Sequence, residues 1–138
     1  MKVVFDTCVI IDILQKRDPF YKEAVKLLHA VSNRHIEGII TAKSLSDIYY
    51  LLRKNLCEED VRKVIETLNE LFILVDTFAS DCELALSSKM TDYEDAIMVE
   101  TAIRVKADCI VTRNTKDYKE SKIKIFSPKE LCNEISLN

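Results

Sequence analysis

The sequence contains very little glycine and proline. Gly38 is the only glycine, and Pro19 and Pro128 are the two prolines. A GxxxxGK[ST] phosphate loop or a GxGxxG dinucleotide turn needs several glycines, because the backbone must approach the phosphate closely. Neither motif can be built from a single glycine. The sequence therefore excludes P-loop kinases and Rossmann dehydrogenases.

Cysteine pairs and long apolar runs are also missing. The five cysteines are an odd number, and no two of them form a CxxC pair. This argues against a disulfide framework and against a structural zinc site. The first apolar residues, 3–5, are interrupted at once by Asp6, so no signal peptide or membrane span is expected. We expect a cytoplasmic protein without membrane contact.

Chain length and net charge limit the classes of protein that remain possible. The chain has 138 residues, 48% of them hydrophobic and 31% charged, which predicts a single globular domain covering residues 1–138. The net charge of −3 argues against a protein that coats nucleic acid by bulk positive charge. It does not exclude a nuclease that binds its substrate through metal ions.

Short apolar segments alternate with amphipathic ones along the chain. Expected strands lie at residues 3–5, 38–40, 72–75, 109–111 and 123–126. Expected helices lie at 7–15, 19–31, 41–52, 58–71, 79–88, 92–106 and 128–135, the second of them with Asp18 as N-cap and Pro19 at its first position. This alternation predicts an α/β fold with a central parallel sheet of four to five short strands and helices on both faces.

Acidic residues follow the expected strands. Asp6 ends the first strand, Asp47 lies on the helix after the second, and Asp92 and Asp95 open the helix before the fourth. Residues 112–114, Thr-Arg-Asn, follow that strand. Ligands of such sheets bind beyond the carboxyl ends of the strands, so these side chains can meet at one site.

Each acid also has a purely structural interpretation. Asp6 and Asp92 could be helix N-caps, and Asp47 could be a solvated helix residue. Asp95 precedes an apolar run, which favours an inward carboxylate that needs a partner or a metal. Several inward carboxylates without matching cations repel one another, and Mg²⁺ or Mn²⁺ would relieve that repulsion. Asp12, on the first helix, is expected at the surface.

Three segments together resemble the PIN domain, a small metal-dependent nuclease fold that includes the VapC-type toxins of bacterial toxin–antitoxin pairs. They are VVFDTCVIIDIL at residues 3–14, TAKSLSDIYYLL at 41–52 and TDYEDAIMVETAIRVKADCIVTRNTKDY at 91–118. The last is the most specific, because an acidic pair, an Ala-containing helix, an apolar strand and Thr-Arg-Asn follow in that order. The likeness spans about residues 3–126.

The resemblance implies roles for individual residues. Asp6, Asp47 and Asp95 would bind Mg²⁺ or Mn²⁺, and Asp92 would be an auxiliary acid. Asn114 and Thr112 would occupy the last active-site position, and Thr7 would lie beside Asp6. The implied reaction is hydrolysis of RNA phosphodiester bonds by a metal-dependent endoribonuclease. A cognate antitoxin and a homodimer are partners that the resemblance allows.

A basic segment follows the expected site. It includes Arg113 and Lys116 and extends to Lys124 with a net charge of +3, counting five basic residues against Asp117 and Glu120. It could guide a phosphate backbone, and it could equally be a solvated loop.

Three positions depart from the family pattern. Cys8 stands where Asn is frequent, Asp47 where Glu is usual, and Asn114 where an Asp is frequent, although Asp117 could substitute for it. These departures support an alternative, a catalytically weak PIN-fold module that binds RNA or a protein partner without cutting. A phosphoryl-transfer receiver or phosphatase is a weaker alternative. Receivers usually pair two acids after the first strand and haloacid-type phosphatases need Asp-x-Asp, whereas here Asp6 and Asp12 are six residues apart.

Overall fold

Five parallel strands form the centre of the protein. The computed structural model describes residues 1–136, so the last two residues of the predicted domain lie outside the described residues. The strand order is β3-β2-β1-β4-β5. In chain order the strands are β1 (Lys2–Phe5), β2 (Glu37–Thr41), β3 (Ile73–Val75), β4 (Cys109–Val111) and β5 (Lys124–Phe126). All four strand pairs are parallel, as the alternation of elements predicted.

The helices begin and end close to the predicted positions. They are α1 (Thr7–Leu14), α2 (Tyr21–Ser32), α3 (Ala42–Leu52), α4 (Glu58–Leu71), α5 (Ala79–Ala85), α6 (Tyr93–Arg104) and α7 (Pro128–Glu134), with a short 3-10 helix, η1 (Thr115–Tyr118). The predicted start of α2 is wrong. Its N-cap is Phe20, and Asp18 and Pro19 precede the helix rather than opening it.

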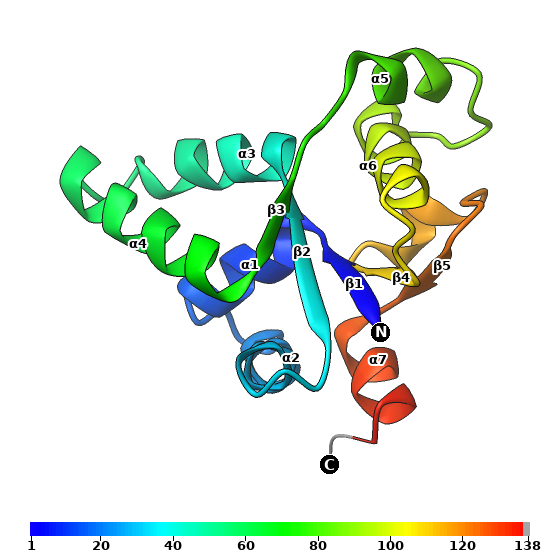
Figure 1. Cartoon of the computed structure of the whole chain (residues 1–138). Helices are drawn as coiled ribbons and strands as arrows, with labels where there is room; N and C mark the ends of the chain where they lie inside the picture. The colour runs from blue at the N-terminus through cyan, green and yellow to red at the C-terminus, as the bar shows by residue number, and fades with distance from the viewer. Residues whose placement is uncertain (137–138) are drawn as a thin grey trace.

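Helices cover both faces of the sheet, which confirms the predicted fold class (Figure 1). On one face, residues of α1, α2, α3, α4 and α7 pack with Val3 and Phe5 of the central strand. On the other face, α6 and Tyr118 of η1 pack with Val4 and Ile110. Val3, Val4 and Phe5 are completely buried, because a central parallel strand is covered on both sides.

The single glycine has a packing role in this arrangement. A Cβ at Gly38 would lie 2.6 Å from a ring carbon of Phe72 and 2.8 Å from a methyl carbon of Val31. Strand β2 can therefore approach α2 and the Phe72 ring closely only because this residue lacks a side chain. Phe72 in turn meets the Phe5 ring edge-on, with 5.1 Å between the centroids.

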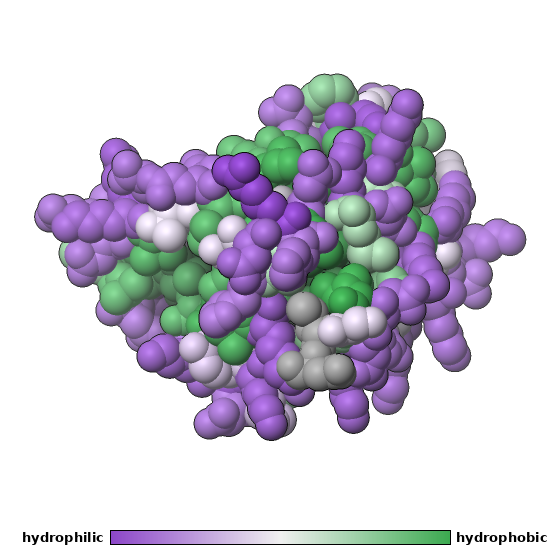
Figure 2. Space-filling model, turned by 60° about the horizontal axis from the view of Figure 1, so that its bottom comes forward, coloured by the Kyte–Doolittle hydropathy of each residue, from purple (hydrophilic) through white to green (hydrophobic). Residues whose placement is uncertain are grey.

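One face of the molecule is mostly hydrophilic. On the face shown in Figure 2, hydrophilic side chains project over most of the surface and hydrophobic residues lie in the hollows between them. Within residues 1–136, no helix combines the length and the hydrophobicity that crossing a bilayer requires.

Parallel pairing brings the functional segments together. Phe5 is aligned with Val111, so Asp6 and Thr112 leave neighbouring strands at the same edge. The backbone N–H of Asp6 donates to the Val111 carbonyl at 3.0 Å and holds this junction. Helices α3 and α6 begin or pass near the same edge, where the pocket described below is formed.

Candidate metal centre and active site

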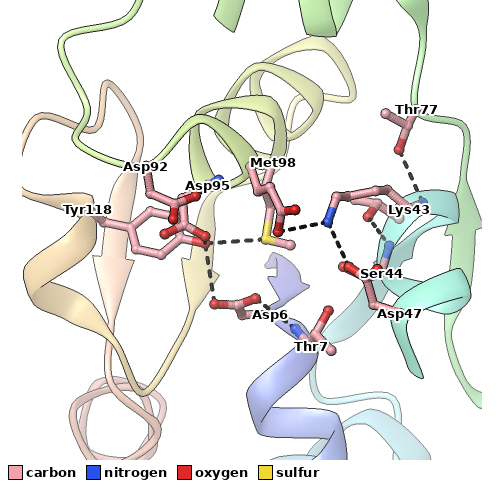
Figure 3. A network of polar contacts seen from close by, with 12 residues as sticks. Asp6, Thr7, Lys43, Ser44, Asp47, Thr77, Asp92, Asp95, Met98 and Tyr118 are labelled. Carbon is pink, nitrogen blue, oxygen red and sulfur yellow. Dashed lines mark hydrogen bonds and ion pairs between the residues drawn. The ribbon is translucent and has the colours of Figure 1, made fainter. Parts of the chain in front are cut away.

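A pocket of about 370 Å³ lies at the carboxyl edge of the sheet and is lined by residues of α1, α3 and α6. Five residues predicted for the site line it, namely Asp6, Thr7, Asp47, Asp95 and Asn114. Figure 3 shows that Asp6 and Asp95 approach one another on one side, while Asp47 lies beside Lys43 on the other. The structure therefore brings Asp6, Asp47 and Asp95 to one pocket and divides these three acids into two groups.

Asp6 is held in place by three donors, namely the Thr7 N–H and the hydroxyls of Thr112 and Tyr118. It is the N-cap of α1, where its Oδ1 accepts the Thr7 N–H at 2.7 Å. Its Oδ2 accepts the hydroxyl of Thr112 at 2.7 Å. The capping interpretation and the site interpretation are therefore both true of this residue. Because one strand end and one helix start fix the carboxylate, it is pre-positioned at the bottom of the pocket.

Tyr118 connects the two central acids. Its hydroxyl lies 3.1 Å from Asp95 Oδ1 and 3.3 Å from Asp6 Oδ2. The ring is 2% exposed and packs in the core formed with Met98 of α6. A single phenolic hydrogen serves two carboxylates, which shows how close they are (Figure 3).

Burial and mutual repulsion raise the pKa of these groups. Burial, then the charges of Asp6 and Asp92, raise the pKa of Asp95 to about 7, although the Tyr118 hydroxyl opposes the change. Burial also raises the pKa of Asp6, against the hydrogen bonds of Thr112, Thr7 and Tyr118. Among the described residues, neither carboxylate has an ion-pair partner. The pair thus carries negative charge that no cation of residues 1–136 compensates.

Asp47, unlike Asp6 and Asp95, forms an ion pair. Its Oδ2 is 2.7 Å from Lys43 Nζ, and the same ammonium lies 3.2 Å from Glu94 Oε2. The two acids outweigh the effect of burial and raise the pKa of Lys43. Lys43 therefore ties α3 to α6 across the pocket, and Asp47 does not join Asp6 and Asp95.

The remaining predicted residues have defined places. Asp92 is the N-cap of α6 and accepts the Asp95 N–H at 3.0 Å, so its structural interpretation is confirmed. The Thr112 hydroxyl donates to Asp6 and accepts the Asn114 N–H at 3.1 Å. Cys8 lies beside it, with 3.8 Å between Sγ and the Thr112 oxygen. Lys116 is exposed on η1.

The prediction that Asp12 lies on the surface is wrong. Asp12 is completely buried on the inner face of α1, where Arg113 Nε and a terminal nitrogen donate to its two oxygens at 2.8 and 3.2 Å. The Arg113 guanidinium also lies over the Phe20 ring at 4.1 Å. Arg113, predicted to support the substrate, is thus engaged in a structural ion pair. Its predicted role in supporting the substrate stays a prediction, and the ion pair with Asp12 does not support it.

The donor set fits a magnesium or manganese ion in part. Within residues 1–136, no three His, Cys, Asp or Glu side chains are close enough together to form a ready ligand group. Mg²⁺, however, is usually bound by one or two carboxylates, with water and phosphate oxygens completing its coordination. Asp6 and Asp95 supply two such carboxylates in an open pocket. The absence of histidine and thiolate from this pair also suits a hard cation.

Several residues at the site were not predicted. They include Lys43 and Arg17, which line the pocket, the latter from the connection between α1 and α2, and Tyr118, whose hydroxyl contacts both central acids. Tyr118 follows Asn114 by four residues and ends η1, but nothing in the sequence shows that its hydroxyl turns inward. Lys43 precedes Asp47 by four residues on a helix, and this spacing could have predicted their ion pair.

The protein is an α/β protein with a parallel sheet and an acidic pocket at the carboxyl edge of that sheet. A family model described as "PIN domain" matches residues 2–116. This match covers most of the chain, and the protein belongs to the PIN domain family. The resemblance of the three sequence segments is therefore confirmed.

Solved structures support the same fold. The chain is similar to a toxin–antitoxin complex from Klebsiella pneumoniae, at 22% identity and TM-score 0.68, over 91% of this chain and 97% of that one. It is also similar to VapBC2 from Rickettsia felis bound to a promoter DNA fragment, at 19% identity and TM-score 0.65, over 92% and 98%. A third is Mycobacterium tuberculosis VapC20, described as a toxin that cleaves the sarcin–ricin loop, at 10% identity and TM-score 0.64, over 88% and 98%. No curated protein matches the chain.

Proposed function

We propose that this PIN domain protein is a metal-dependent endoribonuclease that uses Mg²⁺ or Mn²⁺. The observation that carries the proposal is the pair Asp6 and Asp95, two acids without a cation partner in residues 1–136, so close that one Tyr118 hydroxyl contacts both. Buried acids that only stabilise a fold are normally paired with a cation, as Asp12 and Asp81 are in this protein. An uncompensated pair at the edge of an open pocket is typical of a site for a divalent ion.

Each residue has a proposed task. Asp6 and Asp95 hold the ion, and the Thr112 hydroxyl and Thr7 N–H keep Asp6 oriented toward it. Asp47 is the third proposed ligand, which requires that its carboxylate leave Lys43. Asn114 offers an amide oxygen at the rim, and Asp92 fixes the start of α6 and so the position of Asp95. A bound ion would supply activation of water and stabilisation of the leaving oxygen.

RNA is the proposed substrate. One structurally similar protein, VapC20, is described as cleaving the sarcin–ricin loop. In this chain, Lys116 and Lys119 are exposed directly after the site and could contact a phosphate backbone. An antitoxin is a proposed partner because similar chains are described in toxin–antitoxin complexes. A homodimer and a cytoplasmic location remain part of the proposal.

A cleavage assay tests the proposed activity. Labelled RNA is incubated with the wild-type protein in Mg²⁺, in Mn²⁺ or in chelator, and beside it with Asp95→Asn. We expect cleavage only with metal, and a loss of at least about 100-fold in Asp95→Asn, the range for removing a group that acts on the reacting atoms. The matched control is Glu59→Gln, a change in an exposed ion pair with Lys63, which leaves cleavage unchanged. Metal-independent cleavage, or equal rates for Asp95→Asn and wild type, would contradict the proposal.

A second candidate function is a module that binds RNA or protein without cutting. The observation that favours it is the ion pair of Asp47 with Lys43, which removes the third acid from the pair Asp6 and Asp95. Binding of RNA without cleavage in either metal, by a protein that is fully folded, would establish this alternative.

A further inference from the structure

Part of the pocket lining is formed by residues that the proposed metal chemistry does not use. Arg17, Tyr50 and Leu51 line the same pocket as Asp6 and Asp95. They come from the connection between α1 and α2 and from the C-terminal half of α3. We propose that Arg17 and Tyr50 form a subsite for one unpaired nucleotide of single-stranded RNA, beside the phosphate that is cut. This inference rests on the proposed function, and it assigns Arg17 and Tyr50 to substrate binding.

Helix α3 directs Tyr50 toward the acids. Lys43, Asp47, Tyr50 and Leu51 follow one another at steps of four, three and one residues, which place them on one face of a helix. That face lines the pocket. A base stacked on Tyr50 would therefore lie along the same wall as Asp47, with its phosphate toward the metal-binding acids.

Tyr50 is the most exposed aromatic side chain among the described large hydrophobic residues, at 67%. The other exposed rings already have partners. Arg113 lies over Phe20 at 4.1 Å, Arg104 lies over Phe78 at 3.8 Å, and the Tyr93 hydroxyl donates to the Cys82 carbonyl at 3.0 Å. The ring of Tyr50 has Lys54 Nζ over it at a longer distance, 5.3 Å from the centroid. An open aromatic face at the rim of a nuclease pocket is suited to stacking with a base, and the nearby ammonium is suited to a phosphate.

Arg17 supplies the matching positive charge. Of the two cations that line the pocket, Lys43 is shared between Asp47 and Glu94. Arg17 is exposed and donates only from Nε to the neutral Gln15 Oε1, at 3.0 Å, and no described carboxylate forms an ion pair with it. Its terminal nitrogens therefore remain free for a phosphate, which a guanidinium can bind with two parallel hydrogen bonds.

The subsite selects unpaired RNA for a physical reason. In a duplex, both faces of each base are covered by its neighbours, so a side chain can stack only on a base that has left the helix. A single strand presents such faces at no unpairing cost. Double-stranded RNA of the same sequence should gain nothing from Tyr50.

Binding measured by fluorescence anisotropy tests the subsite separately from cleavage. All variants are made in the Asp95→Asn background, so that the RNA stays intact, and the probe is a labelled 12-nucleotide single strand or its duplex. We expect Tyr50→Ala to weaken single-strand binding about tenfold, as loss of one stacked base does, and Tyr50→Phe to retain it. Neither change should alter duplex binding.

Arg17→Gln gives an independent signature. It should weaken single-strand binding and lower the slope of log affinity against log salt by about 0.7, the value for one phosphate contact to a single strand. Leu86→Ala is the matched control, because Leu86 is 75% exposed at the end of α5 and does not line the pocket. It should bind both probes as the background does.

The outcomes separate this inference from the proposed function. Single-strand binding by Tyr50→Ala equal to the background, or an equal loss for single strand and duplex, overturns the subsite even if the wild-type protein cleaves RNA. Equal losses in Tyr50→Ala and Tyr50→Phe overturn stacking in favour of the hydroxyl. Conversely, the expected binding pattern in a protein that never cleaves RNA upholds the subsite and overturns the nuclease.

Discussion

Two kinds of buried aspartate occur in this molecule. Asp12 and Asp81, at 0% and 1% exposed, each face an arginine, with Arg113 Nε 2.8 Å from Asp12 and Arg104 Nε 3.0 Å from Asp81. Asp6 is 9% exposed and Asp95 is half-buried, and among the described residues they face each other and a tyrosine hydroxyl. The first kind is compensated within the chain and the second is not.

The pKa values express the same difference. Burial alone would raise the pKa of Asp81, but the hydrogen bonds of Arg104, the Phe78 N–H and Thr101 outweigh it and lower the pKa. At Asp95 burial acts together with the neighbouring acids, and the pKa rises to about 7. Charge at Asp81 therefore stabilises the fold, whereas charge at Asp95 opposes it until a cation binds.

The largest expected effect comes from neutralising the compensated acids. Asp12→Asn and Asp81→Asn should each lower the free energy of unfolding by about 2 kcal/mol, because each leaves a partly buried arginine without its counter-charge. Urea denaturation of each variant measures this loss. Glu59→Gln, in an exposed pair, is the control and should change stability by less than about 0.5 kcal/mol. Stabilities of Asp12→Asn and Asp81→Asn close to wild type would remove the distinction between the two kinds of acid.

The same chemical change at Asp95 should have the opposite sign. In the metal-free protein the folded state keeps a proton on Asp95 up to about pH 7, whereas the unfolded state loses it near the ordinary value of 3.8. Stability is therefore lost as the pH rises through that interval. Asparagine does not titrate, so the stability of Asp95→Asn relative to wild type should rise between pH 5 and pH 8, by about 1 kcal/mol, or roughly 2–8 °C in melting temperature.

Thermal melts in chelator at the two pH values measure this difference. An Asp95→Asn variant whose stability relative to wild type falls between the two pH values would show that the Asp95 charge stabilises the fold, as the Asp81 charge does.

The smallest effect is expected at Lys43, which compensates Asp47 and Glu94 from within the chain. Lys43→Met should free Asp47 and remove a repelling charge, so Mn²⁺ affinity should rise about threefold, or about 0.7 kcal/mol. Calorimetric titration with Mn²⁺ measures the change. The double variant Lys43→Met with Asp47→Asn should lose most of the gain. An unchanged or weaker affinity in Lys43→Met would show that Asp47 is not a ligand.

The sequence predicts the scaffold well because hydrophobic pattern determines it. The alternation of apolar runs and amphipathic helices predicts the parallel sheet. The positions of Asp6 after the first strand and of Asp95 at the start of the helix before the fourth strand predict their common pocket. The hydrophobic pattern predicts the ends of helices less accurately than their existence. At α2, for example, the residue before Tyr21 makes no side-chain capping hydrogen bond.

Pairing between distant residues could not be predicted. Asp12 and Arg113 are 101 residues apart, and an acid on a helix looks the same in sequence whether it is solvated or buried with an arginine. The inward direction of the Tyr118 hydroxyl likewise depends on how η1 packs against α6. These contacts decide which acids are compensated, and so which acids are available to a metal.

The response of stability to Mn²⁺ tests the central claim most directly. Wild type, Asp95→Asn and Asp12→Asn are melted at pH 7.5 in chelator and in Mn²⁺ at about a hundredfold excess over the wild-type Kd, which should add about 2.7 kcal/mol to the wild type. We predict that Asp95→Asn loses most of this increment, and that Asp12→Asn keeps it although it starts from a lower melting temperature. An equal Mn²⁺ increment in wild type and Asp95→Asn, with Asp95→Asn melting below wild type in chelator, would contradict the account.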